Sequence, residues 1–170
     1  IARLAIDRHA AGPRAQRIAL RFLRADADEQ ALSYAELQRL TNRFANGLRG
    51  LGIGAGDRVF VLAGRIAPLY VAVLGSLKNG SVVTPLFSAF GPEPIATRID
   101  IAQAQVLVTT EALYRRKIEK MREQLPSLQH ILIVGDGSEL DVEFKQRAEI
   151  TLALLEFELL QFHRAFLVAL

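Results

Sequence analysis

The spacing of hydrophobic and polar positions changes several times along the chain. Residues 17–24 alternate between polar and apolar side chains, which predicts a strand on an exposed sheet. The acidic stretch 25–30 is typical of a hairpin turn, after which the chain returns through Ala31 and Leu32. A hairpin is therefore expected near the start of the sequence.

A helix is predicted to begin directly after this hairpin. Ser33 and Glu36 have the spacing of a capping box, in which each side chain satisfies a backbone N–H that the first helical turn leaves without a partner. Apolar residues then recur on one helical face, and glycines close the pattern: Leu37, Leu40, Phe44, Leu48, Gly50 and Gly52. These glycines indicate the end of the helix, because a helix C-terminus often needs left-handed backbone angles.

Short apolar runs and longer helical segments alternate through the middle of the chain. Strands are expected at residues 58–63, 81–86, 106–110 and 130–134, and helices at residues 68–77, 92–103 and 111–125. Strands separated by helices of this length are typical of βαβ crossovers between parallel strands. The sequence therefore predicts an α/β fold with a doubly wound, mainly parallel sheet and flanking helices.

The pattern changes again after residue 137. Residues 138–170 form a single helical-looking segment with apolar residues almost all round, and such a helix must be buried by something. No membrane span is expected there, because Glu156, Glu158 and Arg164 lie within its most apolar part. We divide the chain into an α/β part at 1–137 and an apolar tail at 138–170. One hypothesis is a non-catalytic interaction module that docks through this tail on a partner or on a second copy.

Composition narrows the class of protein without naming an activity. Lys and Arg number 21 against 18 Asp and Glu, a net charge of +3 that implies no nucleic-acid partner. The absence of Cys excludes disulfides, Cys-ligated metals and a thiol nucleophile, and it favours a cytoplasmic location. The chain opens without a signal peptide and without Met, so we expect a segment of a longer protein.

Most familiar catalytic motifs are not found in the sequence. His9, His130 and His163 lack the spacing of metal ligands, and no serine occupies a G-x-S-x-G elbow. The glycines of residues 50–56 follow a predicted helix and precede a strand, whereas a phosphate-binding glycine loop follows a strand and opens a helix. We therefore expect no metal site and no hydrolase chemistry, and a Rossmann-type dehydrogenase is only a distant alternative.

Two places at the predicted carboxyl ends of strands are candidate ligand sites. The first is the loop 87–94, which leaves a strand and opens a helix, and ligands of open α/β sheets bind in that crevice. The second is the basic triplet Arg115, Arg116 and Lys117, which offers three cations for charge-assisted hydrogen bonds to phosphate. A solvated helix face is the alternative interpretation of this triplet.

The order of several motifs resembles the front part of AMP-forming acyl-CoA synthetases, particularly the acetate–CoA ligases. The motifs are the helix start at 32–37, the helix segment at 42–48, the glycine-rich turn into Asp-Arg-Val at 51–59 and the Phe-Ser-Ala-Phe-Gly-Pro segment at 87–98. The resemblance covers residues 1–137. Enzymes of this family use ATP with Mg²⁺ to adenylate a carboxylate, and they then pass the acyl group to the thiol of coenzyme A.

The resemblance implies roles for only a few residues. It places the loop 87–94 beside the coenzyme A entrance, with Ala89 where the family often carries Gly, and it assigns Arg115, with Arg116 and Lys117 beside it, to the coenzyme A phosphates. The family's phosphate loop, adenine motif and adenylation Lys are not found among these 170 residues. The resemblance thus implies an incomplete N-terminal part of the adenylate-forming domain, with no catalytic residue of its own and no activity in isolation.

Overall fold

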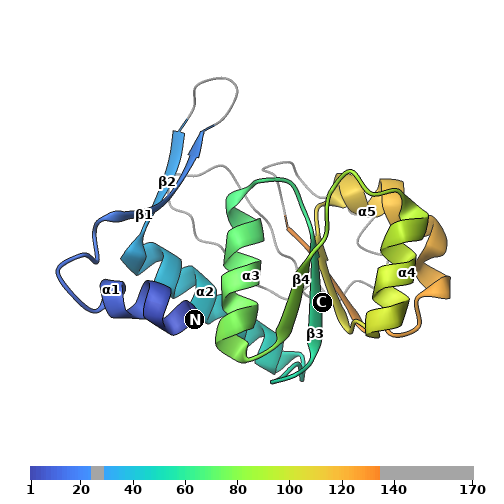
Figure 1. Cartoon of the computed structure of the whole chain (residues 1–170), viewed down its shortest axis with the longest axis horizontal. Coiled ribbons are helices and arrows are strands. Elements are labelled where there is room, and N and C mark those ends of the chain that lie inside the picture. Colours follow the sequence, from blue (N-terminus) through green and yellow to red (C-terminus); the bar gives the residue numbers. More distant parts are fainter. Residues whose placement is uncertain (24–28, 135–170) are drawn as a thin grey trace.

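A four-stranded parallel sheet organises the structure, which is a computed structural model describing residues 1–23 and 29–134 (Figure 1). Its strands lie in the order β4-β3-β5-β6, and every neighbouring pair is parallel. Their bounds are Arg58–Leu62 for β3, Val82–Pro85 for β4, Val106–Thr109 for β5 and His130–Ile133 for β6. The expected α/β fold with a mainly parallel sheet is confirmed.

Helices cover both faces of this sheet, as a doubly wound fold requires (Figure 1). On one face lie α2 (Tyr34–Gly50) and α3 (Ala67–Asn79). On the other face lie α4 (Pro92–Ala102), α5 (Glu111–Lys117) and the 3₁₀ helix η2 (Glu119–Gln124).

The apolar sequence of β3 follows from its place between these two layers. Val59 and Val61 belong to the core under α2 and α3, whereas Phe60 and Leu62 belong to the core under α4 and α5. Successive side chains of a strand point to opposite faces, so a strand covered on both faces needs apolar residues at every position.

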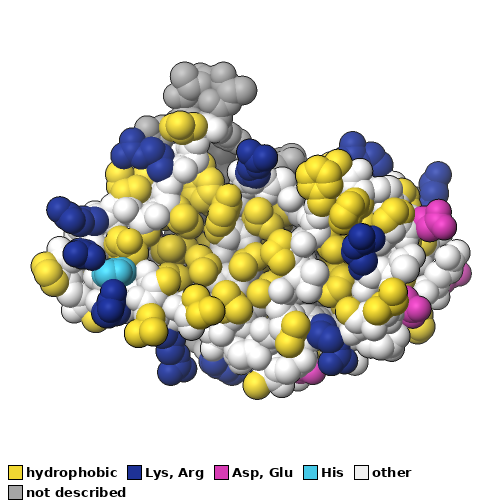
Figure 2. Space-filling model, in the orientation of Figure 1, with side chains coloured by type: hydrophobic (Ala, Val, Ile, Leu, Met, Phe, Trp, Pro, Cys, Tyr) yellow, Lys and Arg dark blue, Asp and Glu magenta, His cyan; other side chains and the backbone are white. Residues whose placement is uncertain are grey.

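The expected hairpin forms a second, two-stranded sheet beside the α2–α3 layer. Strand β1 (Ile18–Leu23) pairs antiparallel with β2 (Glu29–Ser33). The ring of Phe22 packs against that of Tyr70 in α3, with 5.4 Å between centroids. Figure 2 shows hydrophobic side chains gathered over the region between the hairpin and α3, with Lys and Arg side chains along the left side of this view and scattered over its right half.

A buried lysine ties the start of the chain to the helical layer. The chain begins with a π-helical turn (Arg3–Asp7) and the short α1 (Arg8–Ala10). The side chain of Lys78 in α3 is only 4% exposed, and its ammonium forms an ion pair with Asp7 and donates a 2.8 Å hydrogen bond to Asn42 in α2. A buried charge is tolerated when it is paired in this way.

The predicted helix signals are present at the start of α2 and at the end of α3. The Glu36 N–H donates to Ser33 Oγ at 3.3 Å, and the Ser33 N–H donates to Glu36 Oε2 at 2.8 Å, which completes the capping box. The Ser33 hydroxyl also donates to Glu36 Oε2 at 2.7 Å, and this hydrogen bond, together with that from the Ser33 N–H, lowers the pKa of the Glu36 carboxyl. Gly80 ends α3 at φ 84°, a left-handed angle that favours glycine.

One predicted helix is shorter than expected. The helix predicted at 111–125 stops at Lys117, because Ile118 adopts φ −118°, and η2 continues the path with i→i+3 hydrogen bonds such as the 2.9 Å bond from the Met121 N–H to the Ile118 carbonyl. The fully buried side chains of Ile118 and Leu125 both lie in the core under α4. The predicted tail at 138–170 lies outside the described residues. Within the described residues no helix is long and apolar enough to cross a membrane.

Gly75 permits the close approach of α2 and α3, and its replacement provides a test of this packing. A Cβ atom at Gly75 would meet Phe44 Cδ1 at 2.7 Å and the Thr41 carbonyl oxygen at 3.0 Å. We expect Gly75→Ala to lower the free energy of unfolding by about 1–3 kcal/mol, because overpacking outweighs the gain in helix propensity. Urea unfolding measures the change. Gly50→Ala is the control, since nothing lies within 4 Å of that position, and a loss of equal size there would contradict the packing argument.

Candidate functional site

The two candidate places meet at one edge of the sheet. The loop 86–91 follows β4, and α5 follows β5, so both leave carboxyl ends of parallel strands (Figure 1). The helix after β3 lies on one face of the sheet, whereas the helices after β4 and β5 lie on the other. Open α/β sheets bind ligands where neighbouring connections diverge in this way, so the topology supports a ligand site at this edge.

The loop after β4 folds into a tight turn with an exposed aromatic ring. The Phe90 N–H donates to the Phe87 carbonyl at 3.0 Å, which leaves Ser88 and Ala89 at the centre of the turn. The rings of Phe87 and Phe90 meet edge to face at 5.5 Å, and Phe87 is 64% exposed. The Arg98 guanidinium of α4 lies 4.4 Å from the centre of the Phe90 ring, a cation–π contact that fixes this ring.

The three cations of the basic triplet have different surroundings. The Arg115 guanidinium forms an ion pair with Glu111 one helical turn earlier, at 2.7 Å from Nη2 to Oε1. Arg116 is exposed, and it has no hydrogen-bond or ion-pair partner within residues 1–23 and 29–134. Lys117 is half-buried, and its ammonium donates to the Ser88 carbonyl at 2.6 Å and to the Phe90 carbonyl.

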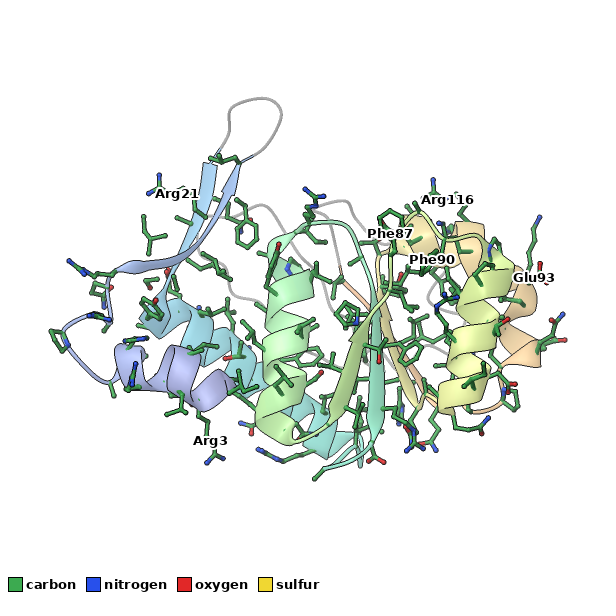
Figure 3. The ribbon with its side chains drawn as sticks, in the orientation of Figure 1. Arg3, Arg21, Phe87, Phe90, Glu93 and Arg116 are labelled. Carbon is green, nitrogen blue, oxygen red and sulfur yellow. The ribbon has the colours of Figure 1, made fainter. Side chains whose placement is uncertain are left out.

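The structure therefore brings the predicted site residues to one end of the molecule, where their side chains have different partners. Figure 3 shows Arg116 at the same end as Phe87 and Phe90, while Arg3 and Arg21 lie at the other end. Within the triplet, the side chains of Arg115 and Arg116 are exposed, whereas the Lys117 ammonium donates to a carbonyl of the turn that contains Ala89.

The glycine-rich segment and His130, for which the sequence predicted no ligand-binding role, lie away from this edge. The glycine-rich segment 51–57 lies between α2 and the amino end of β3, with Gly52 and Gly56 at positive φ and the Gly54 N–H bound to Asp57 Oδ2 at 2.7 Å. It is a helix end and a turn, as its position in the sequence predicts. His130 begins β6 at the amino end of the strand, and burial lowers its pKa.

Two contacts that shape the site could not be predicted from the sequence. Arg98 stacks on Phe90 from α4, and Lys117 reaches the turn from α5 across 27 to 29 residues of sequence. Neither contact corresponds to a sequence motif that would have predicted it.

Tyr114 is a buried residue of α5, next to Arg115 in the sequence. Burial raises the pKa of its phenol, which therefore stays neutral.

The doubly wound sheet with a structured loop at its carboxyl edge belongs to the open α/β folds, whose ligands commonly bind at that edge. The chain matches the family of AMP-binding enzymes over residues 6–156, a region that extends beyond the predicted boundary at 137. The chain belongs to this family.

Several proteins with a similar sequence or structure are coenzyme A synthetases. The chain is 39% identical to the acetyl-coenzyme A synthetase of Bacillus subtilis over 137 residues, which cover 79% of the chain and 23% of the relative. It is 32% identical to the 3-hydroxypropionyl-coenzyme A synthetase of Metallosphaera sedula, covering 86% of the chain and 24% of the relative. The crystal structure of an acyl-CoA synthetase from Brucella canis superposes with a TM-score of 0.69 and 30% identity, over 85% of the chain and 26% of that structure. The chain thus spans about a quarter of the length of these relatives.

Proposed function

We propose that this chain contributes scaffold and part of the coenzyme A entrance to an AMP-forming acetate–CoA ligase. The observation that carries the proposal is the 39% identity to an acetyl-coenzyme A synthetase over 137 residues. In the proposed reaction a carboxylate displaces pyrophosphate from ATP, with Mg²⁺ as the partner of the phosphates, and forms an acyl-adenylate. The thiol of coenzyme A then takes the acyl group and releases AMP.

The geometry of the carboxyl edge supports an entrance for an anionic substrate. Arg116 is exposed and unpaired within the described ranges, and Arg115 is exposed while it pairs with Glu111, so two exposed guanidinium groups, the type of donor that binds phosphate, lie at this edge. The exposed ring of Phe87 lies on the adjoining turn and offers an apolar surface to the same ligand. We assign the coenzyme A phosphates to Arg115 and Arg116, with Ala89 at the tip of the bordering turn.

The described residues supply binding groups for coenzyme A but no group for the chemistry of adenylation. Transfer of an adenylyl group needs preorganised charge around the ATP phosphates. The lysines of the chain are Lys78, Lys117, Lys120 and Lys145, and none lies in a glycine-rich phosphate loop. Lys78 is committed to its ion pair with Asp7. The remainder of the active site is therefore proposed to come from outside this sequence.

The isolated chain should form no acyl-adenylate. Purified chain incubated with acetate, ATP and Mg²⁺ is expected to release no pyrophosphate above a protein-free blank, because its sequence contains no phosphate-loop motif to orient the ATP phosphates. The acetyl-coenzyme A synthetase of Bacillus subtilis is the positive control in the same assay. Acetate-dependent release of pyrophosphate by the chain alone would contradict the division of roles proposed here.

Arg115→Ala tests the phosphate assignment in the complete enzyme. We expect the KM for coenzyme A to rise roughly ten-fold, because a charged hydrogen bond to phosphate is lost, and the effect should shrink at high salt, which screens exposed charges. Acetate-dependent ATP–pyrophosphate exchange should stay unchanged, since adenylation precedes entry of the thiol.

The matched control is Arg49→Ala, which removes an exposed arginine from the end of α2. It should change neither parameter. If Arg115→Ala lowers exchange and thiol transfer together, the basic triplet is a solvated helix face with a structural role, and the phosphate assignment is wrong.

A further inference from the structure

We propose that Lys117 is a positioning residue that holds the turn 87–90 in place through its backbone carbonyls, and that it does not bind phosphate. The proposal starts from where its ammonium lies. Two of its three donors are used by the carbonyl oxygens of Ser88 and Phe90, which flank Ala89 at the centre of the turn. A cation that bridges the carbonyls of residues i and i+2 fixes the direction of the peptide groups between them.

The turn has few other means of support. It follows β4, an edge strand, and its internal backbone hydrogen bond is the 3.0 Å bond from Phe90 to Phe87. The Phe90 ring is held from α4 by Arg98, at 4.4 Å. Lys117 adds the contact from α5, so the turn is attached to both α4 and α5 on this face of the sheet.

The surroundings of Lys117 favour this role over phosphate binding. Its side chain is half-buried, unlike its neighbours Arg115 and Arg116, which are both exposed. To reach a phosphate in solvent, the ammonium would have to give up its hydrogen bonds to the Ser88 and Phe90 carbonyl oxygens, which accept from no other donor within residues 1–23 and 29–134. Lysine suits this position because its ammonium is a compact point charge with donors in three directions.

The hydrogen bonds from Lys117 fix the outer part, or tip, of the turn, where Phe87 and Ala89 lie. With both carbonyls engaged, Ala89 and the exposed ring of Phe87 keep one orientation relative to the basic end of α5. That this tip borders coenzyme A rests on the proposed function, whereas the contact of Lys117 with the turn does not. The two are therefore tested by separate measurements.

The first measurement is amide hydrogen exchange by NMR on the 170-residue chain without any ligand. Lys117→Met keeps the apolar stem and removes the donors, and it is expected to speed exchange of the Phe90 amide about ten-fold or more, because the turn then opens more often. Lys120→Met removes the same charge from an exposed position three residues on and should leave this amide unchanged. The Val108 amide in β5 reports on global stability and should not change in either variant. Equal rates at Phe90 in both variants would overturn the proposal.

A second measurement needs no substitution and covers the case in which Lys117→Met does not fold. Limited acylation of the unaltered chain, followed by peptide mass spectrometry, compares the reactivity of the two lysine amines. The Lys117 amine should react at least about ten-fold more slowly than the Lys120 amine, since a bonded, half-buried ammonium is withdrawn from the reagent. Similar rates at the two lysines would show that the contact is absent.

In the complete enzyme the salt dependence separates positioning from direct binding. Lys117→Met should raise the KM for coenzyme A by an amount that salt does not change, and Lys117→Arg should recover part of the loss because a guanidinium still donates to carbonyls. A rise that disappears at high salt, as expected for Arg115→Ala, would mean that Lys117 binds phosphate directly. If the KM does not move while the Phe90 amide does, the positioning role stands and the coenzyme A assignment of the turn fails.

Discussion

Burial of β3 on both faces constrains the rest of the molecule. With β4 and β5 paired along its two sides and apolar side chains pointing both ways, β3 is stable only if helices cover both faces of the sheet. Each parallel crossover then has to leave at the carboxyl edge and return to the amino edge. The turn after β4 and the basic helix after β5 are neighbours for this reason, although about 27 residues separate Phe90 from Lys117.

The same constraint explains which parts of the fold were predictable from sequence. The capping box at Ser33 and the left-handed end of α3 at Gly80 are local signals, because the atoms involved lie within a few residues of one another. The apolar runs of β3 and β5 were also predictable, because continuous apolar residues indicate a strand that is buried on both faces. The break at Ile118 was missed because both a helix and a 3₁₀ continuation place apolar residues three to four positions apart, and only the core under α4 decides between them.

The site was predictable as a place but not as a set of contacts. Strand ends and clustered cations can be read from the sequence, and the ion pair of Arg115 with Glu111 follows from a spacing of four residues. The contact of Lys117 with two backbone carbonyls cannot be read in this way, because every residue carries a carbonyl and only the path of the chain selects Ser88 and Phe90. Three adjacent cations that look equivalent in sequence therefore differ in their contacts.

Because of this difference, one part of the edge is suited to attract an anionic ligand and another part to orient it. Exposed guanidinium groups such as Arg116 attract an anion over a distance but hold it loosely, because solvent and salt screen them and their side chains lose entropy when fixed. Precision needs groups whose own positions are set by buried contacts, and here those groups are the peptide units of the turn, held by Lys117, Arg98 and the 3.0 Å turn hydrogen bond. A ligand that enters at this edge would thus be drawn by α5 and oriented by the turn, and the contacts of the turn with α4 and α5 keep these two elements in a fixed relative position.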